Sequence, residues 1–167
     1  MRAPPGRHAN AAPGPDLRCG LRARRDLVPT IEPDLRAALE TAFVHLRPGG
    51  AAIFQPDHVR ETYADATDHG GHDGGPGDGR SLRYLQWRWD PDPGDDWYLD
   101  DFAYLLRDAD GSLRVVQDRH RLGMFSRATW FHLFANVGFA ETRACGTGYD
   151  DGAVGAEGFL ALKGNIS

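Results

Sequence analysis

The sequence of 167 residues predicts an α/β fold with an added antiparallel β region. Two observations support this prediction. A helix, a tight glycine turn and a short apolar strand follow one another over residues 33–55, as in the second half of an α/β crossover unit. Alternating aromatic and polar residues with turn signals fill residues 82–120, which is typical of antiparallel strands.

The first unit has clear signals at both ends of its helix. Pro33 suits a first helical turn, where its missing N–H would have no partner, and Pro48 followed by Gly49 and Gly50 ends the helix. The apolar residues 51–55 are expected to form a central strand of a mixed sheet, beside an antiparallel strand from the end of the chain. The apolar stripe of the helix consists of Leu35, Ala38, Leu39, Ala42, Phe43 and Leu46.

The middle of the chain predicts a three-stranded antiparallel sheet. Residues 70–79 are expected to form a loop because Gly and Asp dominate them. The strands cover residues 82–89, 97–107 and 113–120, and Asp and Gly at residues 108–111 predict a hairpin turn.

The last third of the chain predicts a capped helix and two paired strands. Ser126 can cap the helix that contains Trp130, and Gly138 ends it. Residues 141–144 and 159–163 are expected to pair as an antiparallel edge, joined by a polar, Gly-rich loop.

The order of these segments resembles the late core of class I S-adenosylmethionine-dependent methyltransferases, in a bacterial subgroup similar to small-molecule and amino-sugar N-methyltransferases. The resemblance covers roughly residues 30–163, and it implies a truncated Rossmann-like sheet, S-adenosylmethionine as the cofactor of an intact parent, and methyl transfer to an N or O atom of a small molecule. The segments that carry it are Leu46-Arg47-Pro48-Gly49-Gly50, Asp57-His58-Val59-Arg60-Glu61-Thr62, Thr67-Asp68-His69-Gly70-Gly71-His72, Arg119-His120-Arg121-Leu122-Gly123-Met124-Phe125 and Val137-Gly138-Phe139.

The Gly-rich loop that holds the cofactor in this family has no counterpart in the sequence. No strand followed by Gly-x-Gly precedes Pro33, and glycine is needed there because the backbone must approach the ligand closely. Residues 30–167 are therefore expected to be the C-terminal part of a methyltransferase domain, inactive alone and without assignable cofactor-binding residues. The alternative is a non-enzymatic, small α+β ligand-binding or dimerisation module.

Residues 1–29 are expected to form a disordered or out-of-frame tail, because Pro, Ala, Arg and Gly dominate them without an apolar period. A weaker reading is an organelle-targeting address. Residues 21–28 can be encoded by CTT CGT GCA CGA CGC GAT CTG GTA. Shifted by one nucleotide and completed by the C of the next Pro codon, this string encodes Phe-Val-His-Asp-Ala-Ile-Trp-Tyr, which is typical of a sheet strand with a cofactor-facing tip. A frame error or early truncation is thus a hypothesis that the coding DNA would test.

His58 and His69 are the predicted catalytic residues, because imidazole can accept a proton from an amine or hydroxyl near neutral pH. His58 follows the strand of residues 51–55, and open α/β sheets bind ligands at the carboxyl ends of their strands. A purely structural cluster remains an alternative. The predicted substrate-binding residues are Asp57, His72, Trp87, Tyr98 and His120.

The other readings of these residues stay open. The His and Asp residues could bind a metal ion, but their spacing matches no closed zinc pattern, and no metal site is predicted. The aromatic residues of the antiparallel sheet could line a pocket, or they could be core or subunit-interface residues. Arg119 is expected to be a salt-bridge partner along a strand.

Composition narrows the range of partners. The net charge of −5 implies no general attraction to nucleic acid, and no apolar run approaches the roughly 20 residues that span a bilayer. Cys19 and Cys145 do not make a disulfide framework. The expectation is a cytoplasmic protein that binds a small-molecule substrate, with neither nucleic-acid nor membrane partners. A homo-oligomer is an open alternative to a monomer.

Overall fold

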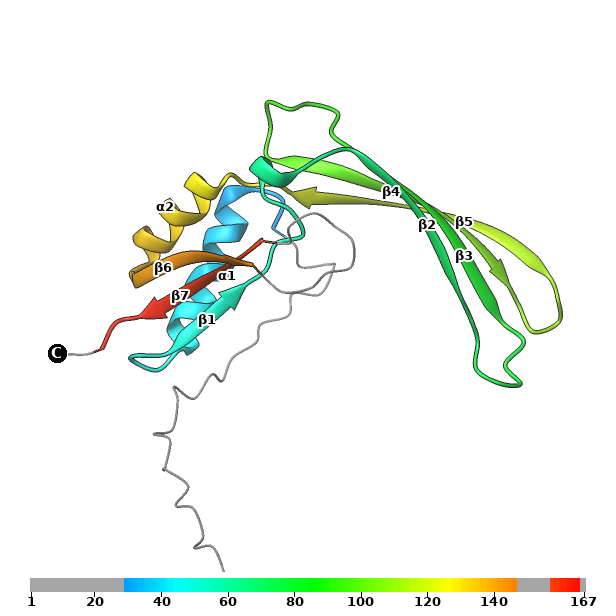
Figure 1. The fold of residues 1–167 in the computed structure, drawn as a ribbon, viewed down its shortest axis with the longest axis horizontal. Helices are drawn as coiled ribbons and strands as arrows, with labels where there is room; N and C mark the ends of the chain where they lie inside the picture. Colours follow the sequence, from blue (N-terminus) through cyan, green and yellow to red (C-terminus); the bar gives the residue numbers. More distant parts are fainter. Residues whose placement is uncertain (1–28, 147–156, 166–167) are drawn as a thin grey trace, which may run out of the picture.

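The computed structural model describes residues 29–146 and 157–165, which form an α/β body and a long antiparallel sheet that extends away from it (Figure 1). The predicted tail and most of the predicted loop before the last strand lie outside the described residues. The elements, in chain order, are α1 (Glu32–His45), β1 (Ala51–Phe54), the 3₁₀ helix η2 (Arg60–Thr62), β2 (Ala66–Asp73), β3 (Ser81–Trp89), β4 (Trp97–Arg107), β5 (Leu113–Gly123), α2 (Arg127–Val137), β6 (Phe139–Gly146) and β7 (Glu157–Lys163).

The α/β body has a three-stranded sheet with α1 and α2 on one face (Figure 1). The predicted helix, turn and strand are confirmed, and β1 lies beside the antiparallel strand β7, as expected. The expected central position in a mixed sheet is wrong for the described residues: the strand order is β1-β7-β6, and both pairings are antiparallel. The β1 edge opposite β7 has no strand partner among the described residues, because no strand that could pair with it precedes α1 there.

Aromatic side chains hold the two helices to the sheet. Phe159 of β7 is fully buried, and its ring stacks on Trp130 of α2 with ring centroids 5.0 Å apart. The ring centroid of Phe134 lies 5.9 Å from that of Phe159, and the ring centroid of Phe54 of β1 lies 5.2 Å from that of Phe134. The core is therefore a continuous aromatic cluster between α2 and the sheet, which α1 completes through Leu35 and Leu39.

Lys163 at the end of β7 caps the C-terminus of α1. Its ammonium group donates hydrogen bonds to the carbonyl oxygens of Phe43 and Leu46, at 2.8 and 2.9 Å. The last carbonyls of a helix have no partner within it, so a cation at this point supplies donors and complements the helix dipole. The two ends of the described chain are joined in this way.

The projecting sheet has four strands in the order β2-β3-β4-β5, one more than the sequence predicts. Residues 70–73, expected in a loop, belong to β2, which pairs with β3 along its whole length. Gly70 fits this strand because a side chain there would meet the Tyr84 ring: an added Cβ would lie 2.8 Å from it. Glycine thus marks a close cross-strand approach here instead of a turn.

The caps and pairings predicted for the last third are confirmed. The Ser126 hydroxyl accepts a hydrogen bond from the Thr129 amide, and Gly138 ends α2 with φ 103°. β6 and β7 pair antiparallel, with Thr142 opposite Ala161. None of the helices in the described ranges is long and apolar enough to cross a membrane.

Phe159→Ala tests the aromatic core. Loss of a fully buried phenyl ring should lower the free energy of unfolding in urea by about 3–5 kcal/mol. Val44→Ala is the matched control, because Val44 is an exposed residue of α1 and its truncation should change stability by less than about 0.5 kcal/mol. Equal effects of the two substitutions would contradict the described core.

Candidate functional site

The candidate site lies at the junction of the two sheets, where the chain leaves β1. Arg60 of η2 fixes this junction: its amide donates to the Phe125 carbonyl at 3.2 Å, and its guanidinium donates to the carbonyls of Pro93 and Asp95. The neighbouring Glu61 carboxylate accepts hydrogen bonds from the Arg127 amide, at 3.0 and 3.1 Å. The segment that carries the predicted catalytic residue His58 is thereby held against the turn between β3 and β4 and against the segment that follows β5.

His58 packs edge-on against two tyrosines at this junction. Its ring centroid lies 5.7 Å from that of Tyr63 and 5.6 Å from that of Tyr98. Burial, with the nearby Arg88 guanidinium as the next largest cause, lowers the pKa of His58 below its ordinary value of 6.5. Asp57 and Asp100 act in the opposite direction but more weakly, so the imidazole is neutral near pH 7 and can accept a proton.

The Tyr98 side chain is fully buried, and its hydroxyl has no hydrogen-bond partner among the described residues. Burial and the nearby Asp57 carboxylate raise the pKa of this phenol, which therefore stays protonated and remains a donor. A buried, unpaired hydroxyl carries a desolvation cost that a bound polar group or water would relieve. Tyr98 is thus a ready donor beside His58.

A buried ion pair that the sequence does not reveal supports these rings. Asp100 of β4 is 5% exposed, and its carboxylate accepts a hydrogen bond from Arg88 of β3 at 3.2 Å. The Arg88 guanidinium also lies over the Tyr98 ring, 5.8 Å from its centroid. Only the register of β3 and β4, which places Arg88 opposite Asp100, brings the two charges together. A sequence-based prediction of the register between β3 and β4 could have revealed this ion pair.

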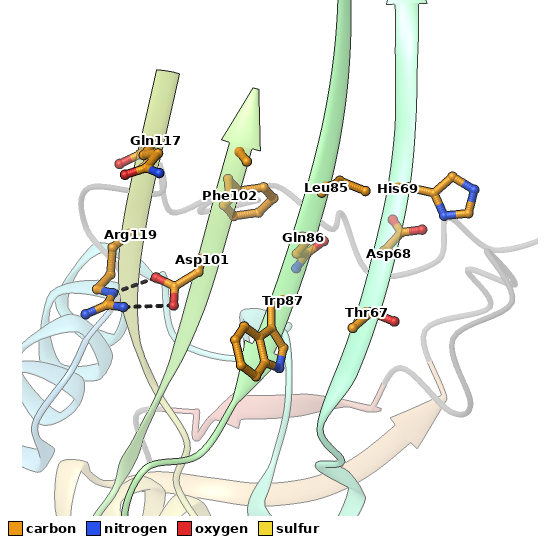
Figure 2. A pocket seen from close by; sticks show the side chains of 12 residues that line it. Thr67, Asp68, His69, Leu85, Gln86, Trp87, Asp101, Phe102, Gln117 and Arg119 are labelled. Carbon is orange, nitrogen blue, oxygen red and sulfur yellow. Dashed lines mark hydrogen bonds and ion pairs between the residues drawn. The ribbon is translucent and has the colours of Figure 1, made fainter. Parts of the chain in front are cut away.

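A concave region lies on the face of the projecting sheet that is opposite to Tyr98. It is a trough of about 730 Å³ that residues of all four strands line, among them His69, Trp87 and Arg119 (Figure 2). The predicted salt-bridge role of Arg119 is confirmed: it makes a bidentate ion pair with Asp101, at 2.5 and 2.9 Å. Trp89 also donates its indole N–H to Asp101, at 2.9 Å.

The predicted site residues lie in separate places in the structure, some at the junction and some on the projecting sheet. His58 and Tyr98 come together at the junction, and Asp57 precedes His58 there. His69 and Trp87 lie on the trough face instead, since they alternate with the residues of the other face. His72 is exposed on β2, outside the trough.

His120 is half-buried on the same face as Tyr98. Its Nε2 lies 3.0 Å from the Asp118 carboxylate, and its ring meets Phe102 edge-on at 5.6 Å. These contacts give His120 partners within the sheet.

The described residues do not build a cradle for S-adenosylmethionine. Their glycines with positive φ lie in the turn before β1, in two hairpins and at the end of α2, and none joins the carboxyl end of a strand to the start of a helix. A close backbone approach to the cofactor would require such a glycine. Likewise, no group of three or more His, Cys, Asp or Glu residues in the described ranges could hold a metal ion.

Solved structures identify this architecture. The chain is similar to DesVI of Streptomyces venezuelae, with a TM-score of 0.67 and 20% identity over 80% of this chain and 52% of that one. It is also similar to an S-adenosylmethionine-dependent methyltransferase from Clostridium acetobutylicum, with a TM-score of 0.55 and 13% identity over 81% and 53% of the two chains. The chain therefore shares the fold of the corresponding part of these two structures.

The chain spans about half the length of these solved structures. No family model matches the sequence. The search of curated proteins found no match either.

The lowered pKa of His58 predicts a specific pH dependence. In the unfolded chain His58 binds a proton below about pH 6.5, whereas the folded chain resists it, so the free energy of unfolding should fall as the pH drops from roughly 7 to 5. His58→Gln should weaken this fall.

NMR titration of the imidazole provides the direct measurement. Its pKa should lie below 6.5 in the wild-type chain and should rise in Arg88→Gln, because the positive neighbour is removed. An imidazole that titrates at or above 6.5 in the wild-type chain would contradict the described environment.

Proposed function

We propose that this chain forms the substrate side of an S-adenosylmethionine-dependent methyltransferase that acts on an N or O atom of a small molecule. The observation that carries the proposal is the methyltransferase fold together with a neutral, half-buried imidazole just after β1. Ligands of open α/β sheets bind at this end of the strands.

His58 would accept the proton that the acceptor amine or hydroxyl loses. Its neutral form suits this role, since burial and Arg88 both disfavour the imidazolium before reaction. Tyr98 would donate its unpaired hydroxyl to a polar atom of the acceptor. Alignment of the nucleophile with the methyl group accounts for most of what such a transfer needs, and rigid neighbours such as the Arg88–Asp100 pair keep both side chains in place.

His69 and Trp87 would serve a substrate portion that extends into the trough. The indole face and the Asp101 carboxylate both favour a cationic group, although Arg119 already pairs with the carboxylate. His69 is exposed at the β2 edge of this trough (Figure 2), on the face opposite to His58, so the proton-accepting role that the sequence suggests for it would apply to an acceptor atom bound in the trough. Cofactor contacts would come from residues outside the described part of the chain, since the described residues do not build the cradle.

Measurement of methyl transfer tests the proposal as a whole. The present chain should transfer no methyl group from radiolabelled S-adenosylmethionine to a panel of small amines and alcohols. The chain fused to a strand and Gly-rich loop of the kind that methyltransferases use for the cofactor should do so, and we call this fusion the extended protein. Tight cofactor binding by the present chain would reject the missing-cradle argument, and an inactive extended protein with bound cofactor would reject the proposed activity.

Replacement of either histidine tests its role. In the extended protein, His58→Ala or His69→Ala should lower the rate of methyl transfer by about 10²–10⁴-fold, because a positioned general base contributes this much. Cofactor affinity, measured by calorimetry, should stay nearly unchanged. His132→Ala on the exposed face of α2 is the control and should keep full activity. A decrease below roughly threefold at both positions would make the two histidines structural.

A non-enzymatic binding or dimerisation module remains the second candidate. The exposed apolar side chains of the projecting sheet favour it, because a sheet needs a partner for such a face. An extended protein that binds cofactor without transferring a methyl group would support this candidate.

A further inference from the structure

No hydrogen bond to a described residue fixes the imidazole of His58. A histidine that exchanges protons usually has one ring nitrogen bound to a carboxylate or a backbone carbonyl, which sets the tautomer and the orientation of the ring. Among the described residues, the ring contacts of His58 are the edge-on contacts with Tyr63 and Tyr98. These two side chains are therefore the ones that can set the direction in which the imidazole points.

Tyr63, which directly follows η2, contacts both of these neighbours at once. Its ring stands at 89° to the imidazole of His58 with the centroids 5.7 Å apart, and its centroid lies 5.0 Å from that of Tyr98. Perpendicular ring pairs at this distance attract each other, because the positive edge of one ring meets the negative face of the other. Tyr63 thus packs against the proposed proton acceptor and the proposed donor together.

The hydroxyl of Tyr63 is held in turn by Asp65. It donates to the Asp65 carboxylate at 3.0 Å, and the same carboxylate oxygen accepts a hydrogen bond from the backbone amide of Asp90 at 3.2 Å. Burial and the Asp65 hydrogen bond raise the pKa of this phenol, which therefore keeps its proton and remains a donor near neutral pH. Because Asp90 directly follows β3, these contacts connect the Tyr63 ring to the projecting sheet.

Tyr98 differs from Tyr63 in how it is packed. Tyr98 is fully buried in a small apolar cluster with Leu122 and Met124, whereas Tyr63 is half-buried and packs on the outside of this cluster. Replacement of Tyr98 would therefore open the cluster itself. Replacement of Tyr63 changes the contact with His58 and leaves the fully buried members of the cluster in place, so the role of Tyr63 can be tested separately.

We propose that Tyr63 is the positioning residue of His58, and that Asp65 holds Tyr63 where its ring can orient the imidazole. The inference rests on the proposed function, since that function makes His58 the proton acceptor. A ring contact orients the imidazole without a hydrogen bond, so both of its nitrogens stay available. One nitrogen accepts the proton that the substrate loses, and the other then releases its own proton to water, which returns the imidazole to its neutral form.

NMR of the full chain tests the contact without methyl transfer. In the wild-type chain, nuclear Overhauser effects should connect the ring protons of His58 and Tyr63. In Tyr63→Leu the pKa of His58 should rise toward its ordinary value of 6.5, because the imidazole becomes less buried while the nearby charges of Arg88, Asp57 and Asp100 remain. Tyr63→Phe keeps the ring and should leave the pKa of His58 as it is in the wild-type chain.

Tyr84→Leu is the matched control. Tyr84 also donates its hydroxyl to a carboxylate, that of Asp68 at 2.9 Å, but its ring packs against Phe102 and not against His58. This variant should leave the pKa of His58 unchanged. Asp65→Ala removes the acceptor of the Tyr63 hydroxyl but no apolar side chain, and it should raise the pKa of His58 less than Tyr63→Leu does. It tests the proposal even where Tyr63→Leu fails to fold.

Kinetics of the extended protein separate this inference from the proposed function. Tyr63→Leu should lower kcat by about 10²-fold, the loss expected when a reacting group moves by about 1 Å, without a change in KM for S-adenosylmethionine. Tyr63→Phe should keep most of the activity. An inactive wild-type extended protein would reject the proposed function, while the NMR results still decide the contact. Absent Overhauser effects, an unchanged His58 pKa or kcat in Tyr63→Leu, or equal effects of Tyr63→Leu and Tyr84→Leu would overturn the proposal.

Discussion

The contacts of Arg60 and Glu61 with distant backbone are the constraint on which the rest of this structure depends. The projecting sheet is a long excursion of the chain between β1 and α2, and these two side chains join its start to its end. Arg60 binds the turn before β4, while Glu61 binds the first amide of α2. Unpaired amides at a helix start favour an acidic partner, so the Glu61 contact also stabilises α2.

This junction explains the character of His58. Because the chain enters and leaves the sheet at one place, His58 packs against two tyrosine rings and near a buried ion pair. Burial and Arg88 then keep the imidazole neutral. The same groups that close the junction thus create a proton acceptor. Removal of Arg88 would also leave the buried Asp100 carboxylate without its ion-pair partner.

Each of the two sheets leaves an edge or a face uncovered by the described residues. The three-stranded sheet has helices on one face, and its strand β1 has a free edge among the described residues. The four-stranded sheet exposes a continuous apolar face, formed by Leu85, Trp87, Leu105, Leu113 and Val115. Bare edges and apolar faces both favour association.

The sequence by itself determined the local elements and their ends. Pro33, Gly49, Ser126 and Gly138 act within a few residues, so helix starts, stops and turns follow from their chemistry. The apolar periods likewise predicted α1, β1 and the strands from residue 82 onward. It also placed His58 correctly after a strand, because that position depends only on chain order.

Tertiary structure alone decided what these elements contact. Gly70 and Gly71 signalled a loop, but pairing with β3 made them part of a strand, because strand formation depends on a partner outside the local sequence. Register separated His69 and Trp87 from His58 and Tyr98, since residues that alternate along a strand face opposite sides of a sheet. The Arg88–Asp100 pair and the apolar face follow from the same long-range pairing, which no local pattern encodes.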